Sequence, residues 1–156
     1  KDHLGEVVLM DSSIEMLRVA DEKIRETGSD NLRTLYHDLA SVHYTQSRFD
    51  LVFSQMVLHH ITDTGDIISK FHDLLNPGGY LAIADLYPED GSFHGEGFTG
   101  HKGFNPEELS ALLEGSGFEN SNHRKCYTIN KRIKDSVILP FDLFLLVAQR
   151  KHDQTS

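Results

Sequence analysis

Residues 6–17 read EVVLMDSSIEML, and this stretch predicts the fold class most directly. Residues 7–10 form a continuous apolar run that ends at Asp11, which is typical of a strand buried on both faces of a parallel sheet. Ser12 and Glu15 match a capping box, so we predict a helix that starts at Ser12 and ends at Gly28. An apolar strand followed at once by an amphipathic helix indicates an α/β protein.

The same alternation of strands and helices continues along the chain. The expected elements are strands at 32–36, 49–54, 80–84, 123–130 and 141–149, and helices at about 67–75 and 105–115. The NPGG sequence at 76–79 predicts a turn before the strand at 80–84. The strand at 141–149 is apolar on both faces, so we expect it inside the sheet. We interpret residues 1–156 as a single α/β domain with helices covering the sheet.

The charge and the cysteine content narrow the choice of partners and compartment. Fifteen Lys and Arg residues stand against 24 Asp and Glu residues, which gives a net charge of −9 with histidines neutral. This balance argues against a nucleic-acid partner, and no apolar run is long enough to span a membrane. The single cysteine, Cys126, excludes an internal disulfide and suits a reducing compartment, so we expect a cytoplasmic protein in which Cys126 is buried.

The carboxyl ends of the predicted strands carry the residues with the most chemistry. Ligands of doubly wound sheets bind at this edge. The residues expected there are Asp11, Asp38, Ser54, Gln55, Asp85, Leu86 and Tyr87. A carboxylate at the end of an early strand is the usual partner of a ribose diol, because it can accept both hydroxyl protons. Two simpler interpretations stay open: Asp11 as a helix-capping residue and Asp38 as part of a solvated turn.

Four segments in order resemble the class I S-adenosylmethionine-dependent methyltransferases. They are EVVLMDSSIEML, YHDL, FDLVFSQMVLHHI and LLNPGGYLAIADL. The resemblance is closest to small-molecule methyltransferases with an LHH segment, and it spans nearly the whole chain. It implies a doubly wound, Rossmann-like sheet that is mostly parallel, with a C-terminal hairpin whose last strand inserts antiparallel.

The resemblance also implies the roles of individual residues. S-adenosylmethionine would be the methyl donor, with Asp11 on its ribose, Ser12, Met16, Asp38 and Leu39 around its adenine, and Ser54 and Gln55 beside its methionine moiety. On the acceptor side, His59 is the candidate catalytic residue, as a base or an orienting group, and His60 and Tyr87 are candidate substrate contacts. An ordinary packing or capping role remains an alternative for these side chains.

The family's first strand and its glycine-rich turn do not occur in this sequence. Gly95 to Gly100 spell G-x-G-x-x-G, but this segment follows no predicted strand and opens no helix, so we reject it as that turn. It fits a lid over the substrate pocket or an ordinary surface loop. The missing strand would lie between those ending at Asp11 and Ser54, and its loss would leave two open strand edges. We therefore expect an additional N-terminal segment, or a second chain that fills the gap by homo-oligomerisation or strand exchange, and little cofactor binding or activity from this truncated domain alone.

The ten histidines do not indicate a metal site. His59 and His60 are adjacent, so in a helix they would point about 100° apart and could not chelate from one face. His94 and His101 have no cysteine nearby, and no zinc-type spacing occurs. We expect no bound metal.

The sequence predicts transfer of a methyl group to a small organic acceptor, and two alternatives stay open. The first is an NAD-dependent oxidoreductase, because a carboxylate at a strand end also suits its ribose. It would need a glycine fingerprint upstream of Asp11 and a catalytic Tyr-Lys pair, neither of which we find. The second is a noncatalytic interaction module on a methyltransferase scaffold.

Overall fold

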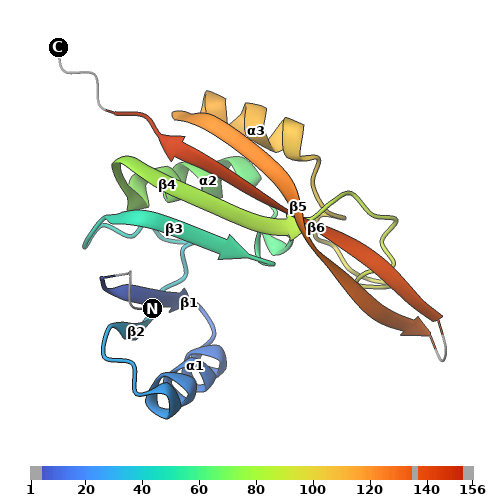
Figure 1. Cartoon of the computed structure of the whole chain (residues 1–156), viewed down its shortest axis with the longest axis horizontal. Coiled ribbons are helices and arrows are strands. Elements are labelled where there is room, and N and C mark those ends of the chain that lie inside the picture. The colour runs from blue at the N-terminus through green and yellow to red at the C-terminus, as the bar shows by residue number, and fades with distance from the viewer. Residues whose placement is uncertain (1–4, 135–136, 153–156) are drawn as a thin grey trace. The chain divides into compact units, whose positions relative to one another are not determined.

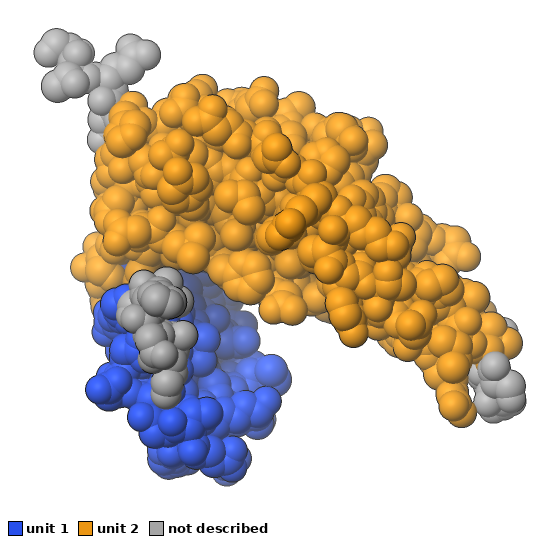
Figure 2. All heavy atoms as spheres, in the orientation of Figure 1, with its two compact units in different colours: residues 1–44 blue, residues 45–156 orange. Residues whose placement is uncertain are grey.

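The computed structural model describes residues 5–134 and 137–152. Contacts within the chain divide it into two compact units, residues 1–44 and 45–156, coloured separately in Figure 2. We describe each unit by itself. The interpretation of residues 1–156 as one domain therefore stays a prediction.

The first unit is a β-α-β motif. Strands β1 (Val7–Asp11) and β2 (Leu32–Tyr36) pair in parallel, and helix α1 (Ile14–Thr27) connects them. The capping residue is Ser13, whose hydroxyl accepts a hydrogen bond from the Met16 amide, so the predicted cap at Ser12 is wrong. The reason is local: an Asp11 carboxylate oxygen accepts from the Ser13 amide at 2.8 Å, and this turn delays the helix.

The second unit contains a four-stranded sheet in the order β3-β4-β6-β5 (Figure 1). Strands β3 (Phe49–Gln55) and β4 (Leu75–Leu86) are parallel, while β6 (Val137–Arg150) runs antiparallel to both β4 and β5 (Phe118–Lys134). The last strand thus lies inside the sheet, as its apolar faces predicted. This arrangement confirms the predicted Rossmann-like α/β sheet, which is mostly parallel, because β3, β4 and β5 run in one direction and the last strand is antiparallel to them.

Two helices pack on this sheet. Helix α2 (Thr64–Leu74) contacts β3 and β4, and α3 (Pro106–Gly115) contacts β5 and β6. The predicted start of α3 is confirmed, because the Asn105 side chain accepts hydrogen bonds from the amides of Glu107 and Glu108. This local capping fixes where the chain leaves the long loop after β4.

Several strands differ from their predicted form. β4 begins at Leu75 and includes the NPGG sequence, because Leu75 pairs with Phe49 across an irregular register. The terminal strands are longer than expected and extend as a two-stranded arm (Figure 1). Cys126 lies on the edge strand β5 and is exposed, so the prediction that it is buried is wrong.

The edge strands carry exposed apolar side chains. In the part of the chain that the structure describes, β1 pairs with β2 alone and β3 pairs with β4 alone. Leu9 of β1 is 38% exposed, so the prediction that this strand is buried on both faces is wrong. Leu51 and Phe53 of β3 are 49% and 55% exposed. Whether another segment or a second chain fills the gap stays a prediction.

Candidate functional site

A sharp turn follows β3 and leads into the site. Met56 has a positive φ of 54°, which is uncommon for a residue other than glycine, and its amide donates to the carbonyl of Ala84 at 2.8 Å. The short helix η1 (Leu58–His60) comes next, and its first residue, Leu58, is fully buried. This turn places the two histidines of the LHH segment at the carboxyl ends of β3 and β4.

His59 and Asp85 form a buried pair at this edge. The His59 ring nitrogen Nδ1 lies 2.6 Å from Asp85 Oδ1, and the two side chains are 1% and 0% exposed. The amides of His59 and Leu86 also donate to the Asp85 carboxylate, at 3.3 and 2.7 Å. Because the carboxylate accepts, Nδ1 carries the proton and Nε2 of a neutral His59 keeps its lone pair.

The loop between β4 and α3 packs against His59. The His101 amide donates to the His59 carbonyl at 2.8 Å, and the Phe104 amide donates to the Leu86 carbonyl at 2.8 Å. A Cβ atom at Gly100 would overlap the His59 carbonyl oxygen and the Phe98 ring. The last glycine of the G-x-G-x-x-G segment therefore allows this close contact, which agrees with our rejection of the segment as a nucleotide-binding turn.

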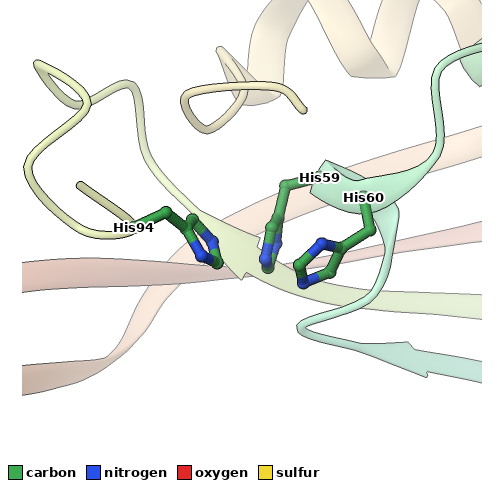
Figure 3. Close-up of side chains that lie close together, drawn as sticks. All are labelled: His59, His60 and His94. Atoms are coloured by element: carbon green, nitrogen blue, oxygen red, sulfur yellow. The ribbon is translucent and has the colours of Figure 1, made fainter. Parts of the chain in front are cut away.

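Three imidazoles meet where this loop covers η1. Figure 3 shows His59 between His60, also on η1, and His94 from the loop. One ring nitrogen from each lies within 4.8 Å of those of the other two. A 3₁₀ helix separates adjacent side chains by about 120°, yet the ring centroids of His59 and His60 lie 4.3 Å apart, so the argument that adjacent histidines cannot approach one point does not hold here.

The surroundings lower the pKa of two of these histidines. Partial loss of hydration is the main cause for His60, whose side chain is still exposed, and the neighbouring His59 adds to it. Burial comes first for His94, followed by the charges of His59, His60 and Lys131. Both rings are therefore neutral near pH 7 and each offers a nitrogen lone pair.

The candidate cofactor residues of the first unit lie at one end of its two strands. Asp11 closes β1 and Asp38 follows β2 by two residues, so the parallel pairing brings both to the same edge. The Asp38 carboxylate accepts from the Ser41 hydroxyl at 2.6 Å, which lowers the pKa of Asp38. Nearby, Ser12 and Met16 are exposed. The turn interpretation is thus borne out for Asp38, whereas Asp11 accepts from the amide of the capping residue Ser13 and is not itself the cap. The ligand roles of both aspartates stay predictions.

The remaining predicted residues lie in the second unit. Ser54 is buried and Gln55 is exposed at the carboxyl end of β3. Tyr87 lines a hollow of about 340 Å³ together with Glu89, which also follows β4, and with residues of β5 and β6 such as Lys125 and Pro140. None of the three clustered histidines lines this hollow, so the structure does not bring Tyr87 together with His60.

Two contacts in this site were not predicted from the sequence: the pairing of His59 with Asp85 and the approach of His94 to His59. Asp85 was recognised as a residue at the end of a strand, but its pairing with His59 was not predicted. The sequence did contain a signal for this pairing, because His59 and Asp85 each follow one of the two predicted strands at 49–54 and 80–84, which are parallel neighbours in the sheet. His94 is separated from His59 by 35 positions and a loop, so no spacing in the sequence indicated that they meet.

With this geometry in place, comparison with known proteins identifies the class. The fold is that of the Rossmann-like methyltransferases, and the chain belongs to the family described as Methyltransferase domain, whose model matches residues 2–134. The structure resembles that of phosphoethanolamine N-methyltransferase 2 from Haemonchus contortus, solved in complex with S-adenosyl-L-methionine. The TM-score is 0.68 at 18% identity, over 94% of this chain and 44% of that chain.

Sequence relatives carry similar names. An uncharacterised methyltransferase of Schizosaccharomyces pombe is 28% identical over 132 residues, which cover 74% of this chain and 46% of that protein. The ubiquinone/menaquinone biosynthesis C-methyltransferase UbiE of Pectobacterium atrosepticum is 29% identical over 83 residues, covering 53% of this chain and 33% of that protein. The chain thus spans less than half the length of these curated relatives.

Among the residues that the structure describes, every helix is too short or too polar to cross a bilayer.

Proposed function

We propose that this chain is part of an S-adenosylmethionine-dependent methyltransferase that acts on a small organic acceptor. The observation that carries the proposal is the family match over residues 2–134, in a chain whose first unit has two aspartates at the carboxyl edge of its parallel strands. Support for the methyl donor comes from the related fold that was solved with S-adenosyl-L-methionine. The name of the UbiE relative suggests quinol-type acceptors as the first to test.

In this proposal the protein aligns the reactants and excludes water. The donor supplies an activated methyl group, which forms a bond to the acceptor while its bond to sulfur breaks and the electron pair stays on sulfur. The Asp11 carboxylate accepts hydrogen bonds from the ribose, with Ser12, Met16, Asp38 and Leu39 near the adenine and Ser54 and Gln55 near the methionine moiety. Alignment and desolvation of this kind can lower a barrier by several kcal/mol (on the order of 7–11 for ideal alignment) without a charged catalytic group.

His59 is the proposed acceptor-side residue. Asp85 fixes the ring and leaves Nε2 as the nitrogen that can take a proton from an acceptor hydroxyl or orient it. His60, on the same short helix, is a proposed acceptor contact. Tyr87 lies in a separate hollow, so it contacts at most a distal part of an extended acceptor.

Ligand binding by the full-length protein tests the choice between methyltransferase, NAD-dependent oxidoreductase and noncatalytic module. S-adenosylhomocysteine is expected to raise the melting temperature while NAD leaves it unchanged, because only a ligand that binds the folded state stabilises it. Asp11→Asn should weaken S-adenosylhomocysteine binding about tenfold or more, since a hydrogen bond to a charged group contributes about 1.5–3 kcal/mol. Asp30→Asn, an exposed aspartate of the same unit, is the matched control. A melting response to NAD alone would favour the oxidoreductase, and no response to either ligand would favour the module.

The role of His59 requires a kinetic readout. His59→Gln is expected to reduce kcat and to remove the acidic limb of the pH profile, because a base stops accepting protons once it is protonated, while His43→Gln leaves both unchanged. Unchanged turnover in the His59 variant would remove this residue from the proposed machinery.

A further inference from the structure

The three-histidine cluster has features that a proton acceptor alone does not require. We propose that His59, His60 and His94 bind one divalent transition-metal ion, zinc by preference, and leave one coordination position open. This inference rests on the geometry of the cluster and does not depend on the methyl-transfer proposal. Neutral imidazole nitrogens suit zinc, copper, iron and nickel, and three protein ligands with an open position are the usual pattern of catalytic zinc.

The first supporting feature is the buried partner of His59. A metal-bound histidine almost always donates its other ring nitrogen to a carboxylate or carbonyl, which fixes the ring and increases the basicity of the ligand. Asp85 does this at 2.6 Å, and amides of His59 and Leu86 hold its carboxylate in turn. His59 Nε2 is thereby aimed away from Asp85 as the remaining donor.

The second feature is the unsatisfied nitrogen of His94. Within the residues that the structure describes, His94 Nε2 is buried and has no hydrogen-bond partner, which ordinarily destabilises a fold. The ring itself is held firmly: it stacks on Phe98 with centroids 3.8 Å apart and meets Phe93 edge-on at 4.8 Å. A metal ion among the three rings would satisfy this nitrogen.

The third feature is the spacing of the donors. Zinc–nitrogen bonds of about 2.0–2.1 Å in a tetrahedron put donor atoms about 3.3 Å apart. The three nitrogens here lie within 4.8 Å of one another, so closure needs movements of roughly 1.5 Å. His60 is exposed and can move most easily. Its exposure also leaves a route from solvent to the open position.

The position of the three-histidine cluster in the fold supports a functional role for the metal ion. The cluster lies where β3 and β4 end, at the edge of the sheet where ligands of such folds bind. If the proposed function also holds, the open position would receive an acceptor oxygen. A metal on His59 Nε2 would then replace the proton-accepting role of this nitrogen, because the same lone pair cannot serve both.

Metal titration of the 156-residue chain, purified without a histidine tag and stripped with chelator, tests the inference. Co²⁺ is expected to bind at one equivalent with the visible absorption of a tetrahedral site, and Zn²⁺ should displace it. His94→Gln and His60→Gln should each weaken binding at least tenfold. Asp85→Asn should weaken it about 10–100-fold, the usual loss when such a supporting partner is removed. His43→Gln, outside the cluster, should bind as the original chain does.

Folding of the variants is checked by circular dichroism, and His60→Gln is the decisive variant because its side chain is the most exposed of the three. Equal affinities of the original chain and His60→Gln, or no saturable Co²⁺ spectrum at millimolar metal, would overturn the proposal. The measurement uses no methyl donor, so its failure is distinguishable from a failure to bind S-adenosylhomocysteine.

Discussion

The two compact units differ in how completely they enclose their apolar side chains. Among the described residues of the first unit, the buried hydrophobic side chains are those of Leu17 and Tyr44, whereas Ile14 and Met16 on α1 are 60% and 58% exposed. The second unit has a dense core in which many side chains are fully enclosed. Its largest are Phe118, Phe144, Leu58, Ile68, Leu75, Leu81, Ile83, Leu86, Leu113 and Leu146.

This difference places the candidate residues of the two units in surroundings of different rigidity. His59 and Asp85 are buried in the densely packed unit, where their geometry is fixed before any ligand binds. Asp11 and Asp38 belong to the unit with little buried apolar surface, where local opening costs less free energy. Binding of a nucleoside at that edge would therefore stabilise the first unit more than the second.

The largest expected effect is on the core of the second unit. Phe144→Ala should lower the free energy of unfolding by about 3–5 kcal/mol, because this ring is fully buried and its removal leaves a cavity. Urea titration followed by far-UV circular dichroism measures this loss, since the chain has no Trp to report by fluorescence.

Phe53→Ala is the matched control on the neighbouring part of the same sheet. Phe53 is 55% exposed, so its truncation should cost at most about 1 kcal/mol. A cost similar to that of Phe144→Ala would show that the exposed face of β3 is covered in solution. Sedimentation of the variant and the original chain would then test whether a second copy covers it.

A smaller effect is expected in the first unit. Leu17→Ala should cost about 2 kcal/mol, at the low end for such a truncation, because the surrounding helix is partly exposed and can relax. Hydrogen exchange should show faster exchange of the β1 and β2 amides, with β4 unchanged. Val19→Ala, at a 46% exposed position of the same helix, should leave all of these amides unaffected. Faster exchange throughout the chain would mean that the two units unfold together.

The features that sequence predicted well are those fixed by neighbouring residues. The start of α3 depends on Asn105 and Pro106, and both act within one helical turn. The interior position of β6 follows from apolar residues on both of its faces. The start of β4 was missed because pairing with Phe49 overrides the local turn preference of the NPGG sequence. Such pairing depends on the tertiary structure.

The candidate site shows the same division. Residues at the ends of strands were identified because each follows its own apolar run, as Asp11 and Ser54 do. The proximity of His59 and His94 was not predicted, because it depends on how a loop folds back across η1. The exposure of Cys126 was missed for a related reason: it depends on the position of β5 at the edge of the sheet and on the shift in register between Lys125 and Tyr127.

The smallest expected effect concerns acid titration at the edge of the first unit. The Ser41 hydroxyl bonds to Asp38 and is the main reason that the pKa of this carboxyl is lowered. Because the pKa is lower in the folded state, the stabilisation from this group is fully present above the unfolded pKa of about 3.9 and is lost as the pH falls through the folded pKa. Ser41→Ala should raise the pKa of Asp38 and so reduce this loss, as measured by carbon NMR of the carboxyl groups.

Asp142 serves as the internal reference in that experiment. Its pKa is lowered by bonds to Lys125 and Thr128, all in the second unit. Ser41→Ala should therefore leave the Asp142 titration unchanged. A parallel shift of both carboxyl groups would mean that the two units are coupled, and the contrast between a rigid and a weakly stabilised unit would have to be abandoned. An unshifted Asp38 would instead show that other bonds to its carboxylate, such as those from backbone amides, lower its pKa more than the hydroxyl does.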